Sequence, residues 1–192
     1  MNIEPIATGT VASACVNGIS FETVLFERDG PVGDDHKGFE RSLSGHDGTY
    51  MHTSALQKGH TVLNWRSWTG LSVEEMQAVS KVLGAGIPVG CLLENVRFSG
   101  IPDFSQLAPT SRLVFPKKTS KGWFSQAVLA VWEQNGPCKT VGQRLADHYG
   151  QPDLVRAFIA AAQGKRGVTG MVLSAGWISV GDAVMVYPPV RD

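Results

Sequence analysis

Apolar residues along this chain come mostly in short runs that alternate with polar residues, a pattern typical of β-strands. Val11–Val16 and Ile19–Phe26 are two such runs, and Asn17-Gly18 between them is the pair typical of a type I′ turn. We therefore predict a hairpin here. Further short strands are expected at 92–98, 112–115, 124–132, 168–173 and 183–187, with 176–182 as the turn between the last two.

One segment carries apolar residues at helical spacing and has a helix-start signal. Ser72 and Glu75 have the spacing of a capping box, in which the Ser72 hydroxyl accepts from the Glu75 N–H and the Glu75 carboxylate reaches back to the Ser72 N–H. Gly84 is expected to end this helix. The glycines of 84–90 do not match a dinucleotide-binding loop, because the third glycine comes one position late and Pro88 would block the following helix.

Two more helices are expected after Cys138, one ending near Gly150 and one that begins with Pro152 and ends before Gly164. Many short strands with few helices predict a mainly β (α+β) fold, in which peripheral helices decorate a β-barrel-like core. The 22 glycines, mostly single residues between apolar runs, agree with many turns. A length of 192 residues suits a single domain over 1–192.

Charge and composition exclude several classes of function. The 17 basic and 17 acidic residues balance, so there is no electrostatic reason to expect nucleic acid or an anionic membrane as a partner. No apolar run approaches the roughly 20 residues of a membrane span. The first five residues lack the basic and apolar segments of a signal peptide. We therefore expect a soluble, cytoplasmic protein.

The polar segment 28–48 shows no periodicity and is interpreted as a functional loop.

Cys138 is the most informative single residue. It lies in Asn135-Gly136-Pro137-Cys138, where the chain leaves an apolar strand and a helix is expected to begin. The partial positive charge of a helix start, together with Lys139, favours the thiolate form, which attacks sulfur or binds a soft metal. Most cysteines are buried for packing, and Cys15 and Cys91 are interpreted in that way. Three cysteines without a CxxC pair argue against a disulfide framework or a structural zinc site.

Four segments in a fixed order carry a family resemblance. They are Gly33-Asp34-Asp35-His36-Lys37-Gly38 with Arg41; Leu93-Glu94-Asn95-Val96 with Gly100; Gly136-Pro137-Cys138; and Arg166-Gly167 leading to Gly176–Asp182. Together they resemble the MOSC domain, the family named after the C-terminal domain of molybdenum cofactor sulfurase. The resemblance runs from about residue 18 to 188. One departure is Leu93, which stands where the family usually has glycine.

The resemblance implies a barrel similar to that of pyruvate kinase and a molybdenum-cofactor (molybdopterin) or sulfur-carrier function. Larger relatives join the domain to a cysteine desulfurase that uses pyridoxal phosphate, which is not expected to bind this chain. This chain resembles the stand-alone members, some of which are similar to proteins that give resistance to N-hydroxylated base analogues.

The resemblance also assigns roles to individual residues. Cys138 would either ligate molybdenum or carry a persulfide sulfur. Arg41, Lys37 and Arg166 are the cations expected at an anionic ligand, such as the phosphate of a pterin cofactor. His36, with Asp34 and Asp35, is a candidate for a metal or proton-transfer cluster at the same site. Glu94 and Asn95, expected in an apolar strand, are interpreted either as pocket walls or as a structural hydrogen-bonded pair.

Three functions remain open on the sequence. The first is a molybdenum-dependent reductase of N-hydroxylated compounds. The second is a persulfide carrier that receives sulfur from a separate cysteine desulfurase for metal–sulfur cluster formation. The third is a non-catalytic binding module. A reductase would need a partner protein as electron donor, because the chain has neither a ferredoxin cysteine spacing nor a dinucleotide fingerprint.

Overall fold

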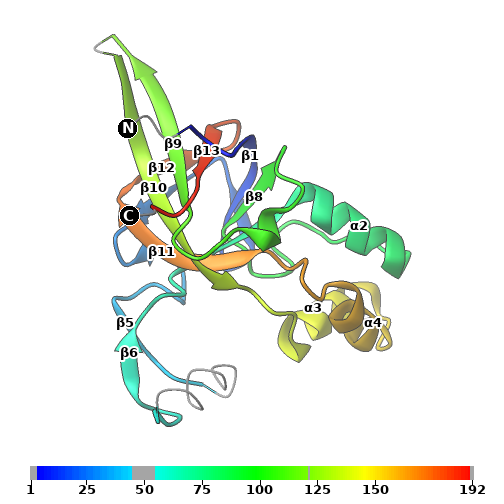
Figure 1. The fold of residues 1–192 in the computed structure, drawn as a ribbon. Coiled ribbons are helices and arrows are strands. Elements are labelled where there is room, and N and C mark those ends of the chain that lie inside the picture. The colour runs from blue at the N-terminus through cyan, green and yellow to red at the C-terminus, as the bar shows by residue number, and fades with distance from the viewer. Residues whose placement is uncertain (1–3, 45–54, 121, 191–192) are drawn as a thin grey trace.

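A closed β-barrel forms the body of the protein (Figure 1). The computed structural model describes residues 4–44, 55–120 and 122–190. Within them, the seven barrel strands are β1 (Ala7–Val16), β7 (Trp68–Ser72), β8 (Val96–Ser99), β9 (Arg112–Thr119), β10 (Gly122–Gln134), β11 (Val168–Ser174) and β13 (Ala183–Tyr187). The expected mainly β fold with peripheral helices is confirmed.

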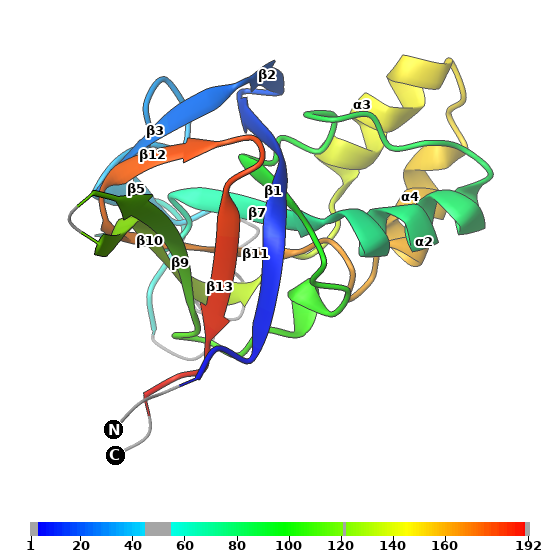
Figure 2. The same cartoon turned by 90° about the horizontal axis from the view of Figure 1, so that it is seen from above.

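The strands follow the order β13-β9-β10-β11-β7-β8-β1, and pairing of β1 with β13 closes the ring (Figure 2). Neighbours are antiparallel except β7 and β8, which are parallel. A parallel pair needs a crossover connection. Helix α2 (Val73–Leu83) lies in this connection. Strand β7 was not predicted from the sequence, although it is central to the barrel.

The predicted hairpin turn is confirmed, because Asn17 and Gly18 both have positive φ, at 49° and 82°. The prediction of one continuous second strand over 19–26 is wrong. The chain breaks at Glu22 into β2 (Ile19–Phe21), which pairs with β1, and β3 (Thr23–Glu27), which pairs with β12 (Gly176–Ser179) in a separate sheet. Both pieces alternate with period two, so the sequence pattern does not show the break.

The polar segment 28–48 contains two short strands rather than only loop. β4 (Gly30–Pro31) extends the small sheet with β3, and β5 (Glu40–Ser42) pairs with β6 (Thr61–Leu63) in a two-stranded sheet of its own. Residues 45–48 of this segment lie outside the described residues. In Figure 1 the β5–β6 pair lies apart from the main barrel, on the side opposite the tip of the β9–β10 hairpin.

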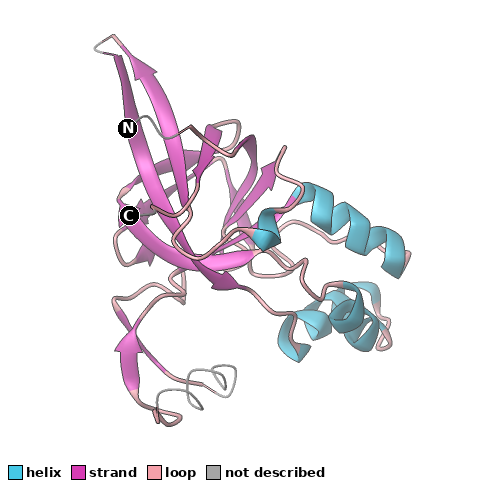
Figure 3. Cartoon of the chain, viewed as in Figure 1, coloured by secondary structure: helices cyan, strands magenta, loops and turns pink. Residues whose placement is uncertain are grey.

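The helices lie together on one side of the barrel (Figure 3). Besides α2 they are α3 (Lys139–Tyr149) and α4 (Leu154–Ala161), close to the predicted positions, and a short 3₁₀ helix η2 covers Phe104–Gln106. No helix among the described residues is long and apolar enough to cross a membrane. A second apolar cluster, which includes Met76, Leu145 and Phe158, packs these helices together.

Half of the predicted capping box of α2 forms. The Glu75 N–H donates to the Ser72 hydroxyl at 3.2 Å, and Gly84 is the C-cap, as expected. The Glu75 carboxylate does not return to Ser72. It accepts from the N–H and the hydroxyl of Ser105, at 3.0 and 2.8 Å. Burial raises the pKa of Glu75, and the bonds from Ser105 oppose that effect.

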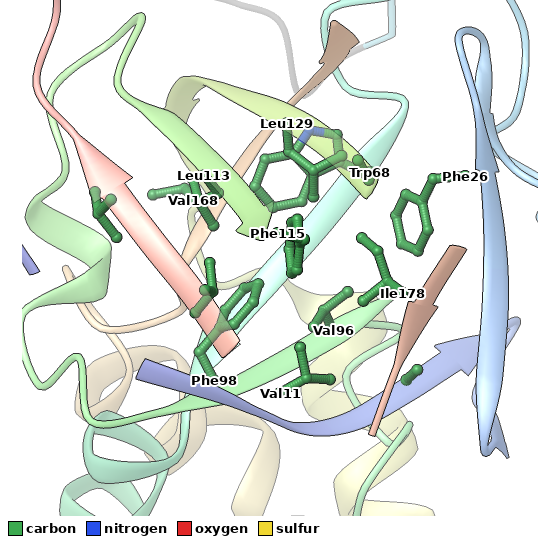
Figure 4. Packing of buried hydrophobic residues seen from close by; sticks show 14 of the residues in the cluster. Val11, Phe26, Trp68, Val96, Phe98, Leu113, Phe115, Leu129, Val168 and Ile178 are labelled. Carbon is green, nitrogen blue, oxygen red and sulfur yellow. The ribbon is translucent and has the colours of Figure 1, made fainter. Parts of the chain in front are cut away.

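Large apolar side chains fill the barrel interior (Figure 4). Trp68, Phe98 and Phe115 are all at most 1% exposed, and the ring centroids of Phe98 and Phe115 lie 6.2 Å apart. The barrel is therefore a packed core, and a ligand site has to lie outside it.

The strand predicted at 92–98 begins only at Val96, so Glu94 and Asn95 lie in the turn before β8 and not within an apolar strand.

Candidate functional site

A cavity of about 700 Å³ lies between the β5–β6 sheet, the ends of barrel strands and the start of α3. Its size is in the range of pockets that hold small molecules or cofactors. Its walls are rich in side chains of both charges. The charged or nucleophilic lining residues are Asp35, His36, Lys37, Glu40, Arg41, Arg66, Glu133, Cys138 and Arg166.

Cys138 is the N-cap of α3, so the predicted helix start is confirmed. Strand β10 ends at Gln134, and the three residues after it lead directly into the cap. Cys138 has extended backbone angles (φ −134°, ψ 166°), and its side chain makes no capping hydrogen bond. The thiol is free, half-buried and part of the cavity wall. It can therefore meet a ligand in the cavity without first breaking a bond.

Arg166 lies beside Cys138 and is only 8% exposed. Its Nη1 donates to the carbonyl of Gly136 and its Nη2 to the carbonyl of Leu92, both at 3.1 Å. Its Nε is buried without a hydrogen-bond partner among the described residues. Burial lowers the pKa of Arg166, and the nearby Cys138 opposes that effect. The guanidinium thus fixes the segment before Cys138 and places a buried positive charge next to its sulfur.

Arg41, on β5, stacks on an aromatic wall. Its guanidinium carbon lies 4.7 Å from the ring centroid of Trp65, whose ring is 6.0 Å from that of Trp132. Stacking of this kind holds an arginine in place. Arg41 lines the cavity, as the sequence predicted for an anion-binding cation.

Arg66 is a cavity residue that the sequence reasoning missed. Its Nη2 donates to Asn135 Oδ1 at 3.3 Å, and its Nε lies 3.6 Å from Glu133 Oε1. The sequence held one signal, since Arg66 is a charged residue between Trp65 and Trp68 at the start of a strand. A charge among buried aromatic residues needs a partner or a function. The partner residues lie in β10 and just after it, so only the fold reveals the contact.

Lys37 borders the cavity, but its ammonium group is engaged elsewhere. Its Nζ lies 2.8 Å from Glu27 Oε2 and 2.9 Å from Asp29 Oδ2. Hydrogen bonds to these carboxylates raise the pKa of Lys37. Neither carboxylate lines the cavity. Lys37 therefore contributes less to an anion site than the three arginines do.

His36 and Asp34 form a bonded pair at the cavity wall. Asp34 Oδ1 accepts from the backbone N–H of His36 at 2.8 Å and lies 3.2 Å from its ring Nδ1. Asp34 Oδ2 accepts from Asn95 Nδ2 at 2.8 Å. His36 lines the cavity, whereas Asp34 and Asn95 lie behind it. Asn95 therefore holds Asp34 in place behind the cavity rather than lining the cavity.

Glu94 does not line the cavity either, and it makes a structural ion pair. Its Oε1 accepts from the Gly90 N–H at 2.8 Å and from Arg97 Nε. Arg97 in turn donates to the carbonyls of Ile87 and Pro88. Both side chains are buried. The pair fixes the loop after α2, which also supplies the Leu92 carbonyl to Arg166.

The structure thus brings Cys138, Arg41, Arg166, His36 and Lys37 to one cavity. Of the predicted site residues, it leaves Glu94 and Asn95 outside the lining. Among the described residues, no group of three or more His, Cys, Asp or Glu side chains could hold a metal ion by itself. A metal held at this site would therefore have fewer than three such ligands among the described side chains.

Comparisons with known proteins bear on the family and the fold. A model of the MOSC domain matches residues 57–185. The YuaD protein of Bacillus subtilis (strain 168), whose name assigns it provisionally to metal-sulfur cluster biosynthesis, is 29% identical over 164 residues, which are 84% of this chain and 78% of that protein. A crystal structure of YuaD from Bacillus subtilis has a TM-score of 0.83 at 26% identity and covers 95% of this chain and 97% of that chain.

A more distant structure shares the fold alone. It is the crystal structure of YiiM from Escherichia coli, with a TM-score of 0.58 at 14% identity. The match covers 96% of this chain and 72% of that chain.

Proposed function

This chain belongs to the MOSC domain family, and from that premise we propose that it binds a molybdenum cofactor, with Cys138 as the protein ligand of the metal. The observation that carries the proposal is the cavity itself, which places one free thiol among three arginines. A sulfur carrier that holds only a persulfide would have no need for a space of about 700 Å³.

The residues present fit such a group chemically. Thiolate is a soft ligand suited to molybdenum, and arginine N–H forks suit a phosphate. Arg166 adds a buried Nε with no hydrogen-bond partner among the described residues, beside Cys138. The cofactor, when bound, would supply two-electron reduction–oxidation chemistry. Cys138 would hold it at the metal end, and Arg41, Arg66 and Arg166 would hold its anionic part.

The reaction class we propose is reduction of N-hydroxylated compounds, in which two electrons and two protons cleave the N–O bond. One proton joins the leaving hydroxyl to form water, and the other is taken up by the nitrogen. The two electrons would come from a separate electron-donor protein. The chain's own contribution is to bind and orient the ligand and to exchange protons at the cavity wall. His36 is the lining group suited to proton exchange near neutral pH.

Metal content of purified protein tests this proposal. Wild type expressed where the cofactor is abundant should contain molybdenum in stoichiometric amount, and Cys138→Ser should contain none. Cys91→Ser is the matched control, because Cys91 is also half-buried but does not line the cavity. Absence of molybdenum from wild type, or equal amounts in Cys138→Ser, would reject the assignment.

A second function is favoured by a different observation, the provisional assignment of the YuaD relative to metal-sulfur cluster biosynthesis. Under this function Cys138 receives sulfur from a cysteine desulfurase as a persulfide and passes it on. Incubation with desulfurase and cysteine should then add about 32 Da, one sulfur atom, to Cys138 and not to Cys91. An unmodified Cys138 would exclude the carrier function.

If Cys138→Ala changes neither metal content nor any cellular phenotype, the remaining function is that of a non-catalytic binding module.

A further inference from the structure

The histidine at the cavity wall has only one ring nitrogen available to a ligand. His36 Nδ1 is held 3.2 Å from Asp34 Oδ1, and the His36 backbone N–H donates to the same oxygen at 2.8 Å. This double contact fixes the ring relative to the carboxylate. The His36 side chain is 66% exposed while that of Asp34 is 4% exposed. Nε2 is therefore the nitrogen left for a ligand.

Asp34 is itself held in a fixed orientation by residues behind the cavity. Asn95 Nδ2 donates to Asp34 Oδ2 at 2.8 Å, and Asn95 Oδ1 accepts the Thr69 N–H at 2.8 Å. Asn95 is 3% exposed, so its amide cannot turn freely. A buried amide that is bonded at both ends, and a carboxylate that is bonded at both oxygens, make a rigid support for the imidazole.

The same contacts make the imidazolium form of His36 favourable. Burial opposes ionisation of Asp34, but hydrogen bonds from His36 and Asn95 outweigh it and lower the pKa of Asp34. Reciprocally, the hydrogen bond to Asp34 raises the pKa of His36 above its ordinary value of 6.5. Asp35 also favours the charged ring, whereas burial and Arg66 oppose it. The outcome is a histidine at the wall of a ligand cavity whose charged form persists to higher pH than that of an ordinary imidazole.

Protonation of His36 would change the charge balance of the cavity substantially. Four permanent cations and three carboxylates line it, namely Lys37, Arg41, Arg66 and Arg166 against Asp35, Glu40 and Glu133. The formal net charge of the lining is therefore one positive, and Lys37 is already engaged by two carboxylates outside the cavity. One further positive charge doubles the formal net charge of the lining.

We infer that the cavity is a pH-linked anion site, in which His36 supplies a titratable Nε2–H donor beside Arg66 for a phosphate-like dianion. Asp34 and Asn95 are positioning residues that act through His36. The inference rests on the proposed function only for the class of ligand. It predicts a behaviour that a cavity of arginines alone would lack, because arginine stays charged at all relevant pH values.

Linkage gives the direction of the effect. If protonated His36 favours the anion, then the bound anion favours protonated His36 by the same factor. The anion should therefore bind more weakly as the pH rises through the pKa of His36. For one charge-assisted hydrogen bond at a partly exposed site, we expect a change of about tenfold in Kd.

Sulfate is the suitable probe, because its charge stays constant where inorganic phosphate titrates. The Kd for sulfate is measured from about pH 5.5 to about pH 8.5 in the metal-free protein, and the His36 ring signals are followed by NMR over the same range. We expect about tenfold weaker binding at the high-pH end, and a rise in the pKa of His36 when sulfate is present.

Three variants make the test specific. His36→Gln should bind sulfate with the weak, high-pH affinity of the wild type at every pH, and Asp34→Asn should move the pH dependence to lower pH. His148→Gln is the matched control, since His148 is an exposed histidine of α3 outside the cavity, and it should behave as wild type. Sulfate affinity independent of pH in wild type, or a pKa of His36 that sulfate does not change, would overturn the inference.

The outcome is independent of the proposed cofactor. The sulfate measurement uses protein without molybdenum, so it succeeds or fails on the lining residues alone. A protein that binds sulfate in the expected pH-dependent way but never acquires molybdenum would reject the proposed function and leave the pH-linked anion site standing.

Discussion

Replacing Gly167 with alanine should destabilise the protein severely, whereas the same change at Gly164 should not. The two glycines have nearly the same positive φ, 71° and 68°, so both variants place alanine in left-handed backbone. A Cβ on Gly167 would overlap the carbonyl oxygen of Gly70 on β7, well inside the 3.0 Å limit of real Cβ contacts. A Cβ on Gly164 would meet only Gln106 Nε2, at 3.9 Å.

The magnitudes follow from these surroundings. Left-handed backbone costs alanine about 1–2 kcal/mol, and the stiffer unfolded chain returns about 0.4–1 kcal/mol, so Gly164→Ala should cost about 1 kcal/mol. At Gly167 the overlap adds about 1–3 kcal/mol of overpacking. The bonds that Gly167 makes with the Ser105 hydroxyl and the Asn135 N–H, at 2.6 and 2.9 Å, are also weakened, at about 1 kcal/mol each. We expect a total of about 4–6 kcal/mol for Gly167→Ala.

Urea unfolding of the two variants and the wild type measures the difference directly, from the midpoints and the slopes. Gly167→Ala should also weaken sulfate binding, because the displaced residue lies next to Arg166 and bonds to Asn135 at the cavity. Equal destabilisation by the two variants would refute the reasoning, since it would mean that β7 and β11 separate without cost. Normal stability of Gly167→Ala would refute it as well.

Three further predictions concern the ion pair, the helical layer and pH. Arg97→Met should cost about 3–5 kcal/mol of stability, because it leaves the buried Glu94 carboxylate without its partner, and adding Glu94→Leu should recover most of that loss. Urea midpoints of the single and double variants measure this, and a double variant no more stable than the single one would contradict it. Leu145→Ala, at a fully buried position of α3, should cost about 2–5 kcal/mol in thermal or urea unfolding, and a cost below about 1 kcal/mol would show that α3 is not anchored by this contact. The stabilisation from Asp34 with His36 needs an ionised carboxylate and a charged ring. The part from His36 is complete below about pH 6.5 and is lost as the pH rises through the raised pKa of His36. The part from Asp34 is complete above about pH 4 and is lost as the pH falls through the lowered pKa of Asp34. The stability difference between wild type and Asp34→Asn should therefore be largest from about pH 4 to about pH 6.5, and urea midpoints that differ equally at all pH values would exclude this coupling.

Glu94 and Asn95 show that a sequence motif can identify residues without identifying their contacts. The sequence identified both as polar residues that must be satisfied, and it left the choice between pocket wall and structural bond open. In the structure Glu94 pairs with Arg97, and Asn95 bonds to Asp34 and Thr69. Asp34 lies 61 positions from Asn95. No local pattern predicts that contact, because it depends on how the turn after β4 packs against the turn before β8.

What the sequence determined by itself was local. The Asn17-Gly18 turn, the caps at Ser72 and Gly84, and the helix start at Cys138 depend on the conformational preferences of a few adjacent residues, and the structure has each of them. The tertiary structure alone decided which strands pair, where the chain leaves one sheet for another, and that Arg66 lines the same cavity as Arg41, Arg166 and Cys138. These features depend on contacts between residues far apart in the chain, whose energies come from burial and charge pairing in the closed barrel rather than from local backbone preference.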